Sequence, residues 1–436
     1  RLKIDLTEVP GLDNLKDPSG CLKEAQSLAA SVFGACQTFF LVNGSTVGLQ
    51  AVLLAVNRPE TKIIIPRNAH ISILNGLVLS GGVPVFAPAE VDEKWGIPLG
   101  TRIESVLSII KEKRDIEAVL ISQPTYQGTG TDIGEINKKL RETGIPLFAD
   151  EAHGAHLYFQ ERIPLCAQKS GVDLVVQSTH KTLPALTQAS MLHVNTEKWI
   201  EPVKRALDIL QTSSPSYLLM ASLDAVQAQM SERGRALLEK VLELAAELHR
   251  LLKTLSGYLL LHDEIKPPWH HDPTKVVISA AQLGLTGWEL AFILQSKYGI
   301  AVEMSDYYYV LLVLNMGHKR SDIMKIYQAL RSIKDYEKKR PLQALGNLVD
   351  AYRSQPRLVL TPRQTFLEEK VQVPLQQIIG RVAGEPLTIY PPGIPLVWPG
   401  EVFTKEHVER LNWAKKHKLQ VQGISPGDKV FVTAER

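Results

Sequence analysis

The sequence predicts an α/β fold, with a large domain built on a mostly parallel sheet and a smaller α+β C-terminal domain. In the first half of the chain, short apolar runs alternate with segments whose apolar residues recur at helical spacing. Strands of this kind are buried on both faces, as in a parallel sheet covered by helices. One long helical stretch and then a mixed pattern of strands and helices follow. This change indicates a connector and a second domain.

The elements of the first half alternate in a regular order. Strands are expected at 38–42, 62–66, 83–88, 117–122, 145–150, 173–178 and 190–194. Helices are expected between them at 47–56, 70–82, 102–115 and 133–144. Ligands bind at the carboxyl ends of the strands in such sheets, so the residues that follow these strands are the first candidates for a site.

The second half begins with a helix expected over 218–255, which is rich in Ala, Leu, Glu and Arg. Strands at 275–280 and 308–315 and helices at 287–299 and 320–333 come after it. A charged hinge at 336–341 precedes a last unit, which contains IYPPGIPLVWPGE (389–401) and a basic helix. We therefore expect domains at 1–215, 216–340 and 341–436.

The composition is that of an ordinary globular protein, with 44% apolar and 22% charged residues. A net charge of +3 gives no indication of a nucleic-acid or membrane partner. The three cysteines are odd in number and form no CxxC pair, which favours a reducing compartment over a disulfide framework. We expect a cytoplasmic protein, or one of an organelle stroma if a targeting peptide preceded Arg1.

A lysine and an aspartate lie at the ends of two expected strands. Lys181 follows the strand at 173–178, and Asp150 ends the strand at 145–150. A partly buried lysine loses proton affinity and can form a Schiff base with an aldehyde cofactor. Pyridoxal phosphate (PLP) is such a cofactor, and it needs a carboxylate against its pyridine nitrogen. The structural alternatives are a surface lysine in a loop and an aspartate that caps a helix.

Two further strand ends carry polar residues that suit the same cofactor. Ser45 and Thr46 open the helix after the first strand, where hydroxyl and backbone donors can hold a phosphate. His70 follows the next strand and could stack on the face of the ring. A plain helix cap and a loop or core histidine are the alternatives. Together these residues supply a phosphate site, a stacking residue, a ring-nitrogen acid and an amine on successive strand ends.

The run DEAHGAH (150–156) places His153 and His156 beside acids, so a zinc site is an alternative. The spacing is not HExxH, and no cysteine or third ligand cluster lies nearby in the sequence. These features disfavour a metal.

At this point the sequence resembles the Orn/Lys/Arg decarboxylase family, the bacterial type with the aspartate aminotransferase-like PLP fold (fold type I). The specific matching stretches are VQSTHKTLPALTQASMLHV and IYPPGIP. Further matches, including LVNGSTVGLQAVLLA, FADEAHGAHLYF and QTSSPSYLLMASLD, cover most of the chain in the order of the family. The long members carry an N-terminal wing that this chain has no room for, so it resembles the short, wingless branch. A PGHK-like stretch of the family is also absent and would lie before Arg1.

The resemblance implies a role for each candidate. Lys181 would form the Schiff base, Asp150 would face the pyridine nitrogen and His70 would stack on the ring. His153 would lie near the oxygen side of the ring and assist proton transfer. The phosphate and its surroundings would be lined by Ser45, Thr46, Ser178 and His180. Thr212, Ser213 and Ser214 would reach the phosphate of a partner subunit, so the site would be shared within a homodimer.

The implied reaction is decarboxylation of arginine, lysine or ornithine to an amine for polyamine biosynthesis. The basic end of the substrate needs an acid, and the candidates are Glu303, Asp306 and Glu385, each of which could instead form a surface salt bridge. The sequence does not separate the three substrates. Two alternatives stay open: another PLP reaction on the same fold, such as transamination or side-chain cleavage, and a non-catalytic regulatory relative.

Overall fold

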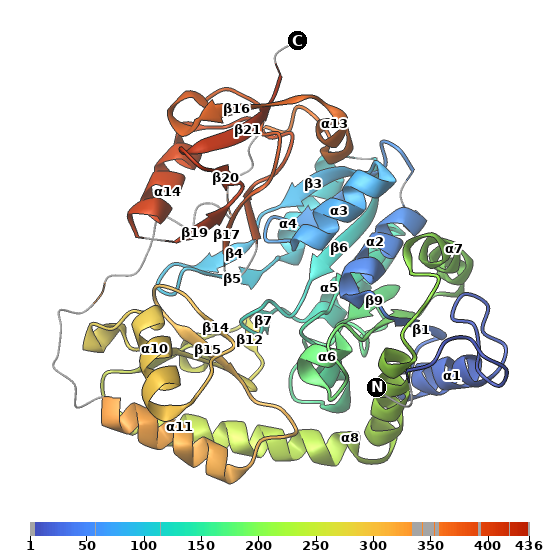
Figure 1. Cartoon of the computed structure of the whole chain (residues 1–436), viewed down its shortest axis with the longest axis horizontal. Coiled ribbons are helices and arrows are strands. Elements are labelled where there is room, and N and C mark those ends of the chain that lie inside the picture. The colour runs from blue at the N-terminus through green and yellow to red at the C-terminus, as the bar shows by residue number, and fades with distance from the viewer. Residues whose placement is uncertain are drawn as a thin grey trace.

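The computed structural model describes residues 5–56, 58–113, 115–333, 342, 353, 357–390, 394–417 and 419–434. A seven-stranded sheet forms the centre of the first half, in the order β1-β10-β9-β8-β6-β2-β3 (Figure 1). Its strands are β1 (Gln37–Leu41), β2 (Lys62–Pro66), β3 (Val83–Ala87), β6 (Ile116–Ser122), β8 (Leu147–Asp150), β9 (Leu174–Gln177) and β10 (Ser190–Val194). β10 runs antiparallel to both of its neighbours, β1 and β9, whereas the other described pairs of strands in this sheet are parallel. The expected parallel-rich sheet is confirmed.

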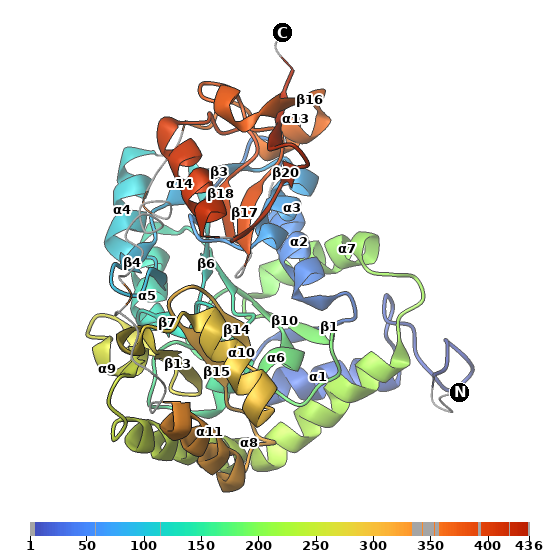
Figure 2. The same cartoon turned by 60° about the vertical axis from the view of Figure 1, so that its left-hand side comes forward.

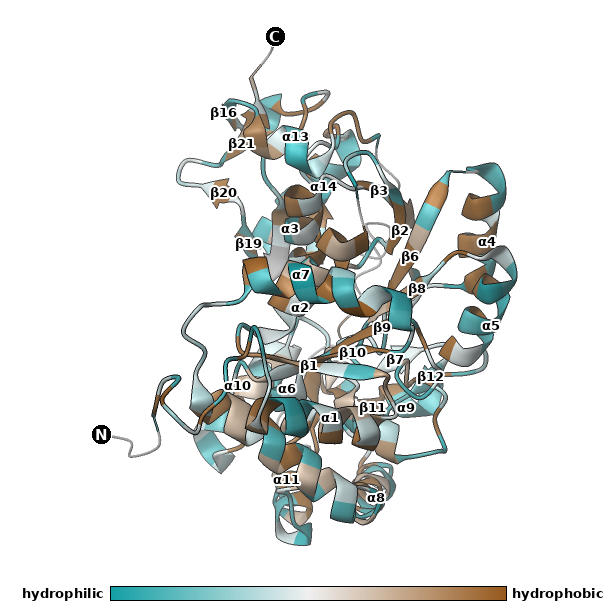
Figure 3. Cartoon of the chain, turned by 90° about the vertical axis from the view of Figure 1, so that its right-hand side faces the viewer, coloured by the Kyte–Doolittle hydropathy of each residue, from teal (hydrophilic) through white to brown (hydrophobic). Residues whose placement is uncertain are grey.

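Helices cover both faces of this sheet, as Figure 3 shows with the apolar strands in brown between them. One face packs against α2 (Gly44–Val56), α3 (Ile71–Ser80) and α7 (Ile200–Leu210). The other face packs against α4 (Ile103–Glu112) and α5 (Ile133–Thr143). Because both faces are buried, the strands carry apolar residues almost without interruption.

Several strands and helices begin at other residues than the sequence predicts, because of their local sequence. The strand expected from residue 145 begins at Leu147, because Pro146 has no backbone N–H to donate to a ladder. The first helix begins at Gly44 and not at residue 47, so Ser45 and Thr46 lie in its first turn. Short elements also occur: α6 (Thr179–Thr182), the hairpin of β4 (Glu90–Asp92) with β5 (Ile97–Gly100), and the pair of β7 (Thr129–Gly130) with β12 (His270–His271).

The chain then crosses to a second, antiparallel sheet through the 36-residue helix α8 (Tyr217–Leu252). This sheet has the order β11 (Leu259–Leu260), β13 (Lys275–Ser279), β15 (Val310–Val313) and β14 (Met304–Ser305). Its apolar core is shared with α8, α10 (Gly287–Tyr298) and α11 (Arg320–Ile333), while α9 (Leu261–Glu264) lies at its edge. α1 (Cys21–Phe33) packs on the first half of α8. No helix among the described residues is both long enough and apolar enough to span a bilayer.

The described residues of the last unit form two three-stranded sheets. One contains β16 (Lys370–Pro374), β21 (Lys429–Thr433) and β20 (Ile424–Ser425), and the other β18 (Ile394–Val397), β17 (Leu387–Tyr390) and β19 (Gln420–Gln422). Among its described residues lie the helices α13 (Pro362–Leu367) and α14 (Lys405–Lys416), the latter being the expected basic helix. The expected hinge at 336–341 and Pro391, Pro392 and Gly393 of the YPPGIP stretch lie outside the described residues. The domain boundaries at 215 and 340 stay a prediction.

The last unit lies beside the β3 edge of the large sheet (Figure 2), and a buried ion pair joins the two. Arg67 lies just after β2. Its Nη1 and Nη2 donate to Oε1 and Oε2 of Glu401, at 2.7 and 2.9 Å. Both side chains are excluded from solvent, with 1% and 0% exposed. Trp398 packs against Phe86 of β3 beside them. These contacts fix the C-terminal unit above the carboxyl end of the sheet.

Candidate active site

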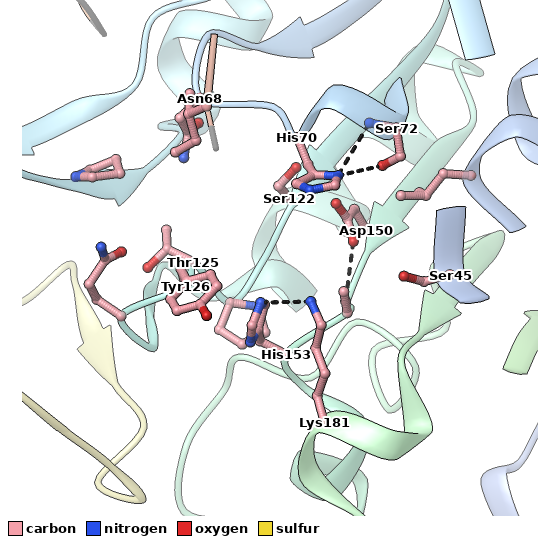
Figure 4. Close-up of a pocket in the computed structure, with 16 residues that line it drawn as sticks. Ser45, Asn68, His70, Ser72, Ser122, Thr125, Tyr126, Asp150, His153 and Lys181 are labelled. Carbon is pink, nitrogen blue, oxygen red and sulfur yellow. Dashed lines mark hydrogen bonds between the residues drawn. The ribbon is translucent and has the colours of Figure 1, made fainter. Parts of the chain in front are cut away.

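A pocket opens at the carboxyl ends of β2, β6 and β8 (Figure 4). It is lined by Ser45, Leu49, Asn68, His70, Ser72, Pro98, Ser122, Pro124, Thr125, Tyr126, Gln127, Asp150, Ala152, His153, Lys181 and Ile394. Five residues that the sequence singled out are therefore brought together here: Ser45, His70, Asp150, His153 and Lys181. They come from the ends of four strands, β1, β2, β8 and β9, as expected for a parallel-rich sheet.

Lys181 reaches the pocket from α6, the short helix that follows β9. Its Nζ lies 3.1 Å from Nε2 of His153. Partial removal from water lowers the pKa of the amine, and the charges of Asp150 and Glu303 oppose this effect. A lysine amine with a lowered pKa is a better nucleophile towards an aldehyde.

Asp150 ends β8, and only 7% of its surface is exposed. One of its oxygens accepts the backbone N–H of Ala152 at 3.2 Å. Burial raises the pKa of the carboxyl, while His70 and Lys181 act in the opposite direction. No side-chain cation forms an ion pair with Asp150 in the described part of the chain, so this carboxylate faces the pocket without its counter-charge.

His70 forms the N-cap of α3. Its Nδ1 accepts the backbone N–H of Ser72 at 3.2 Å and lies 2.8 Å from the hydroxyl of the same residue. These bonds fix the ring at the wall of the pocket (Figure 4). Burial lowers the pKa of His70, which favours the neutral imidazole suited to stacking on an aromatic ring.

His153 lies between two lysines. Its Nε2 faces Lys181, and its Nδ1 lies 3.3 Å from Nζ of Lys275, the first residue of β13. The ring of Tyr126 packs beside it, with centroids 4.5 Å apart. Burial, followed by the charge of Lys275 and then that of Lys181, holds the pKa of His153 well below its usual range.

Sequence reasoning missed Lys275 and Tyr126. The only signal for Lys275 was its position, because a lysine opens KVVIS, a strand with three consecutive apolar residues. The residue is 1% exposed. No sequence pattern distinguished Tyr126 from other loop tyrosines.

The remaining phosphate candidates lie around Ser45. Ser178 donates from Oγ to Oγ of Ser45 at 2.7 Å. His180 contacts the carbonyl of Ala189 through Nδ1 at 2.9 Å, and Thr46 is exposed in the first turn of α2. Ser178 thus supports a residue of the pocket wall, whereas Thr46 and His180 are outside the lining set.

The other candidates are spread over the molecule. Thr212 and Ser214 bond to each other through their hydroxyls at 3.3 Å, and Ser213 and Ser214 are exposed outside the pocket lining. Glu303 accepts the Tyr126 hydroxyl at 2.8 Å, at the border of the pocket. Asp306 accepts the backbone N–H groups of its own turn, at 2.7 and 2.8 Å. Glu385 lies in the C-terminal unit, 4.0 Å from Lys370.

Among the described residues, no three potential metal ligands are gathered around one point. His156 is engaged elsewhere, with Nε2 2.9 Å from Oδ2 of Asp272. The polar atoms left over in the pocket suit a phosphorylated pyridine instead. Asn68 Oδ1 and Ser122 Oγ are buried there without a partner, and such atoms are normally satisfied. Together with Lys181 and the unpaired Asp150, they fit PLP.

Comparison with known proteins places the chain in a family. The models for the Orn/Lys/Arg decarboxylase major domain and C-terminal domain match residues 1–267 and 347–426. The arginine decarboxylase of Bacillus subtilis is 36% identical over 97% of this chain and 87% of its own length. That of Halalkalibacterium halodurans is 36% identical over 99% of this chain and 88% of its own length.

Solved structures confirm the fold. Lysine decarboxylase A from Pseudomonas aeruginosa has a TM-score of 0.85 at 24% identity, covering 99% of this chain and 74% of its own. The constitutive lysine decarboxylase of E. coli has a TM-score of 0.80 at 22% identity, covering 95% and 74%. The expected fold type I and the PLP cofactor are confirmed. The chain therefore belongs to the Orn/Lys/Arg decarboxylase family of PLP-dependent carboxy-lyases.

Proposed function

We propose that this chain decarboxylates L-arginine to agmatine, a precursor of polyamines. The observation that carries the proposal is the gradient of similarity among its relatives. Those named arginine decarboxylase are 34% and 36% identical to it, whereas those named lysine decarboxylase are 26% identical.

Glu303 is the acid that we propose for the basic end of the substrate. It bonds to Tyr126, which lines the pocket, and its charge acts on both Lys181 and Lys275. A guanidinium that enters the pocket needs such a carboxylate, because an unpaired charge removed from water is costly. The carboxylate of Asp306 already accepts hydrogen bonds from backbone N–H groups of its own turn, and Glu385 lies away from the pocket lining. We therefore propose neither residue as the acid that binds the substrate.

Different residues of the pocket would bind the cofactor and transfer a proton in the reaction. PLP supplies, when bound, the electron sink for the electron pair of the broken carbon–carbon bond. Lys181 would hold it, Asp150 would keep a proton on the pyridine nitrogen and His70 would stack on one face. The phosphate would be held by Ser45, with Thr46, Ser178 and His180 around it. His153 would hold a proton at Nε2 for the carbon that loses CO2.

CO2 release from arginine, lysine and ornithine, measured in parallel with added PLP, tests this proposal. We expect kcat/KM for arginine to exceed that for each other substrate at least tenfold, and Lys181→Ala to abolish the activity. Faster release from lysine or ornithine than from arginine would overturn the substrate assignment. Release from none of the three would overturn decarboxylation of a basic amino acid altogether.

A variant pair tests the acid. Glu303→Gln should raise the KM for arginine about 10- to 100-fold, since a hydrogen bond to a charged group contributes about 1.5–3 kcal/mol. Glu239→Gln is the matched control, because Glu239 is an exposed acid of α8 that pairs with Arg162. An unchanged KM in Glu303→Gln would remove this residue from the substrate site.

We also propose that the active enzyme is a homodimer, in which the Thr212–Ser214 segment of each subunit completes the phosphate site of the other. The segment presents hydroxyl groups at the surface, outside the pocket of its own chain. Two large apolar side chains are also exposed, with 75% of Ile209 accessible in the helix that precedes the segment and 50% of Leu186 elsewhere on the surface. Exposed apolar groups of this size favour burial in an interface.

Mixing two inactive variants tests the shared site. Lys181→Ala and a triple alanine variant of Thr212, Ser213 and Ser214 should regain about a quarter of the wild-type activity when their subunits are exchanged, because half of the dimers then hold one intact site. Sedimentation of the wild type checks the dimer. A monomer that is fully active, or mixtures that stay inactive, would overturn the proposal.

We place the enzyme in a reducing compartment, such as the cytoplasm or an organelle stroma. Its three cysteines are free, and Cys21 and Cys36 are exposed. Exposed thiols persist where disulfide formation is suppressed. Fractionation of the source cells with a compartment marker checks this, and recovery of the protein from an oxidising compartment would contradict it.

A further inference from the structure

Lys275 is a buried lysine on a different sheet from the other residues of the site. It opens β13 of the small sheet, and 1% of its surface is exposed. Its Nζ lies 3.3 Å from Nδ1 of His153, on the side of the ring opposite to Lys181. A lysine has a strong preference for water, so its burial behind a pocket residue needs an explanation.

We propose that Lys275 is a positioning residue, which donates to Nδ1 of His153 and so holds this ring as the neutral tautomer with its proton on Nε2, facing Lys181. The inference rests on the family membership of the chain and not on the choice of arginine as substrate.

The argument begins with the hydrogen-bonding capacity of the ring. A neutral imidazole carries one N–H and one lone pair, and His153 meets a lysine nitrogen at each of its two ring nitrogens. Only one lysine can therefore donate to the ring, while the other must accept from it. An imidazolium is disfavoured, because it would be buried between two amino groups.

The surroundings decide which lysine donates. Lys181 has to give up its ammonium protons to form its covalent bond with an aldehyde, so it cannot be the permanent donor. Lys275 makes no such bond and lies near Asp272, a residue with 0% exposure whose charge favours the ammonium form. Buried charges are usually paired with an opposite charge. Of the two lysines beside His153, Lys275 is therefore the one that stays an ammonium ion.

Asp272 is itself fixed as an acceptor. Its Oδ2 accepts from Nε2 of His156 at 2.9 Å, and its Oδ1 accepts both the backbone N–H and the hydroxyl of Thr274, at 2.9 and 2.8 Å. Burial lowers the pKa of Lys275 to about 8, while the charges of Asp272 and Glu303 favour its ammonium form and that of Lys181 opposes it. The ammonium form therefore still predominates at neutral pH. The order Asp272, Lys275, His153, Lys181 thus runs from the small sheet to the reacting amine.

The consequence for the reaction is a proton held in a fixed place. With Nδ1 occupied, the Nε2 proton of His153 points to the nitrogen of Lys181, beside the place where the substrate would react. The large sheet supplies His153, and β13 supplies the lysine that orients it. A properly placed acid contributes typically 10²–10⁴-fold to a rate, so loss of Lys275 should lower kcat by about that factor.

The tautomer is read directly by long-range ¹⁵N–¹H NMR of the PLP-bound protein labelled in histidine, with His153→Gln to assign the signal. We expect the wild type at neutral pH to show a neutral ring with its proton on Nε2. Lys275→Met should mix the tautomers or reverse the preference. It should also raise the pH at which the imidazolium forms, because a neighbouring positive charge has been removed. Lys62→Met is the matched control, since Lys62 opens β2 as Lys275 opens β13 but pairs with Asp115 at the surface.

Two outcomes would overturn the proposal. One is a wild-type His153 that carries its proton on Nδ1 or is an imidazolium at neutral pH, and this measurement needs no variant to fold. The other is an unchanged tautomer in a folded Lys275→Met variant. Turnover supplies a second criterion, because kcat should fall with little change in KM, and Lys275→Arg should recover part of the loss by restoring a donor. Failure to decarboxylate arginine in the wild type would leave the NMR criterion intact, so the two proposals fail separately.

Discussion

The ion pair between Arg67 and Glu401 offers a sharp test of how the C-terminal unit is held. Glu401→Gln removes the charge and nearly keeps the shape. The carboxylate accepts two N–H groups of Arg67 and the backbone N–H of Trp398 at 2.8 Å, all within the protein interior. Removing one partner of a buried pair costs about 3–5 kcal/mol, because the other charge stays buried and uncompensated. We expect a loss of that size.

Urea denaturation, followed by the fluorescence of the fully buried Trp398, measures the loss. The control is Glu409→Gln, which breaks an exposed pair with Lys405 on α14 and should cost no more than about 0.5 kcal/mol. A loss below roughly 1 kcal/mol in Glu401→Gln would refute the claim that this pair secures the C-terminal unit.

Removing the other partner of the ion pair, in Arg67→Met, should cause a loss of stability that depends on pH. A guanidinium stays charged, whereas the carboxyl of Glu401 can take up a proton, and burial already raises its pKa. In Arg67→Met, the pKa of the Glu401 carboxyl is higher in the folded state than in the unfolded state. The free energy of unfolding therefore falls as the pH rises from the unfolded-state pKa to the folded-state pKa. We therefore expect Arg67→Met to cost less at pH 5 than at pH 8, and equal losses at both would contradict this reasoning.

Three further predictions concern the site and its supports. Asp150→Asn should lower kcat about 10²–10³-fold while stability is unchanged or rises, because an unpaired buried carboxylate is lost; a variant with normal turnover would argue against its role at the ring nitrogen. Burial raises the pKa of Glu151 to about 7, above its value in the unfolded chain, so stability should fall between about pH 4.5 and 7, and Glu151→Gln should flatten this slope in thermal melts. Gly287→Ala should destabilise the small domain severely, because an added Cβ would lie 2.1 Å from the carbonyl oxygen of Tyr309; a melting temperature equal to the wild type would contradict that packing.

The sequence alone determined the large domain and the main residues of the pocket. Its strands are mostly apolar because both faces are covered, so the sequence pattern identifies them without tertiary information. Lys181 and Asp150 were found for the same reason: parallel strands end at one edge, and a titratable residue after a buried strand is conspicuous there. His70 and Ser45 followed from the same rule, while their roles at the cofactor remain proposals.

Only the tertiary structure decided which residues meet across domains. Arg67 and Glu401 are 334 positions apart, and nothing local marks either as a partner of the other. Glu303 and Asp306 looked equivalent in the sequence. In the fold, Glu303 accepts a hydrogen bond from the hydroxyl of Tyr126, whereas Asp306 accepts hydrogen bonds from backbone N–H groups of its own turn. Lys275 became part of the site because β13 packs against the loop that carries His153. Sequence patterns encode which face of an element is buried, whereas the partner that it meets depends on how separate domains pack together.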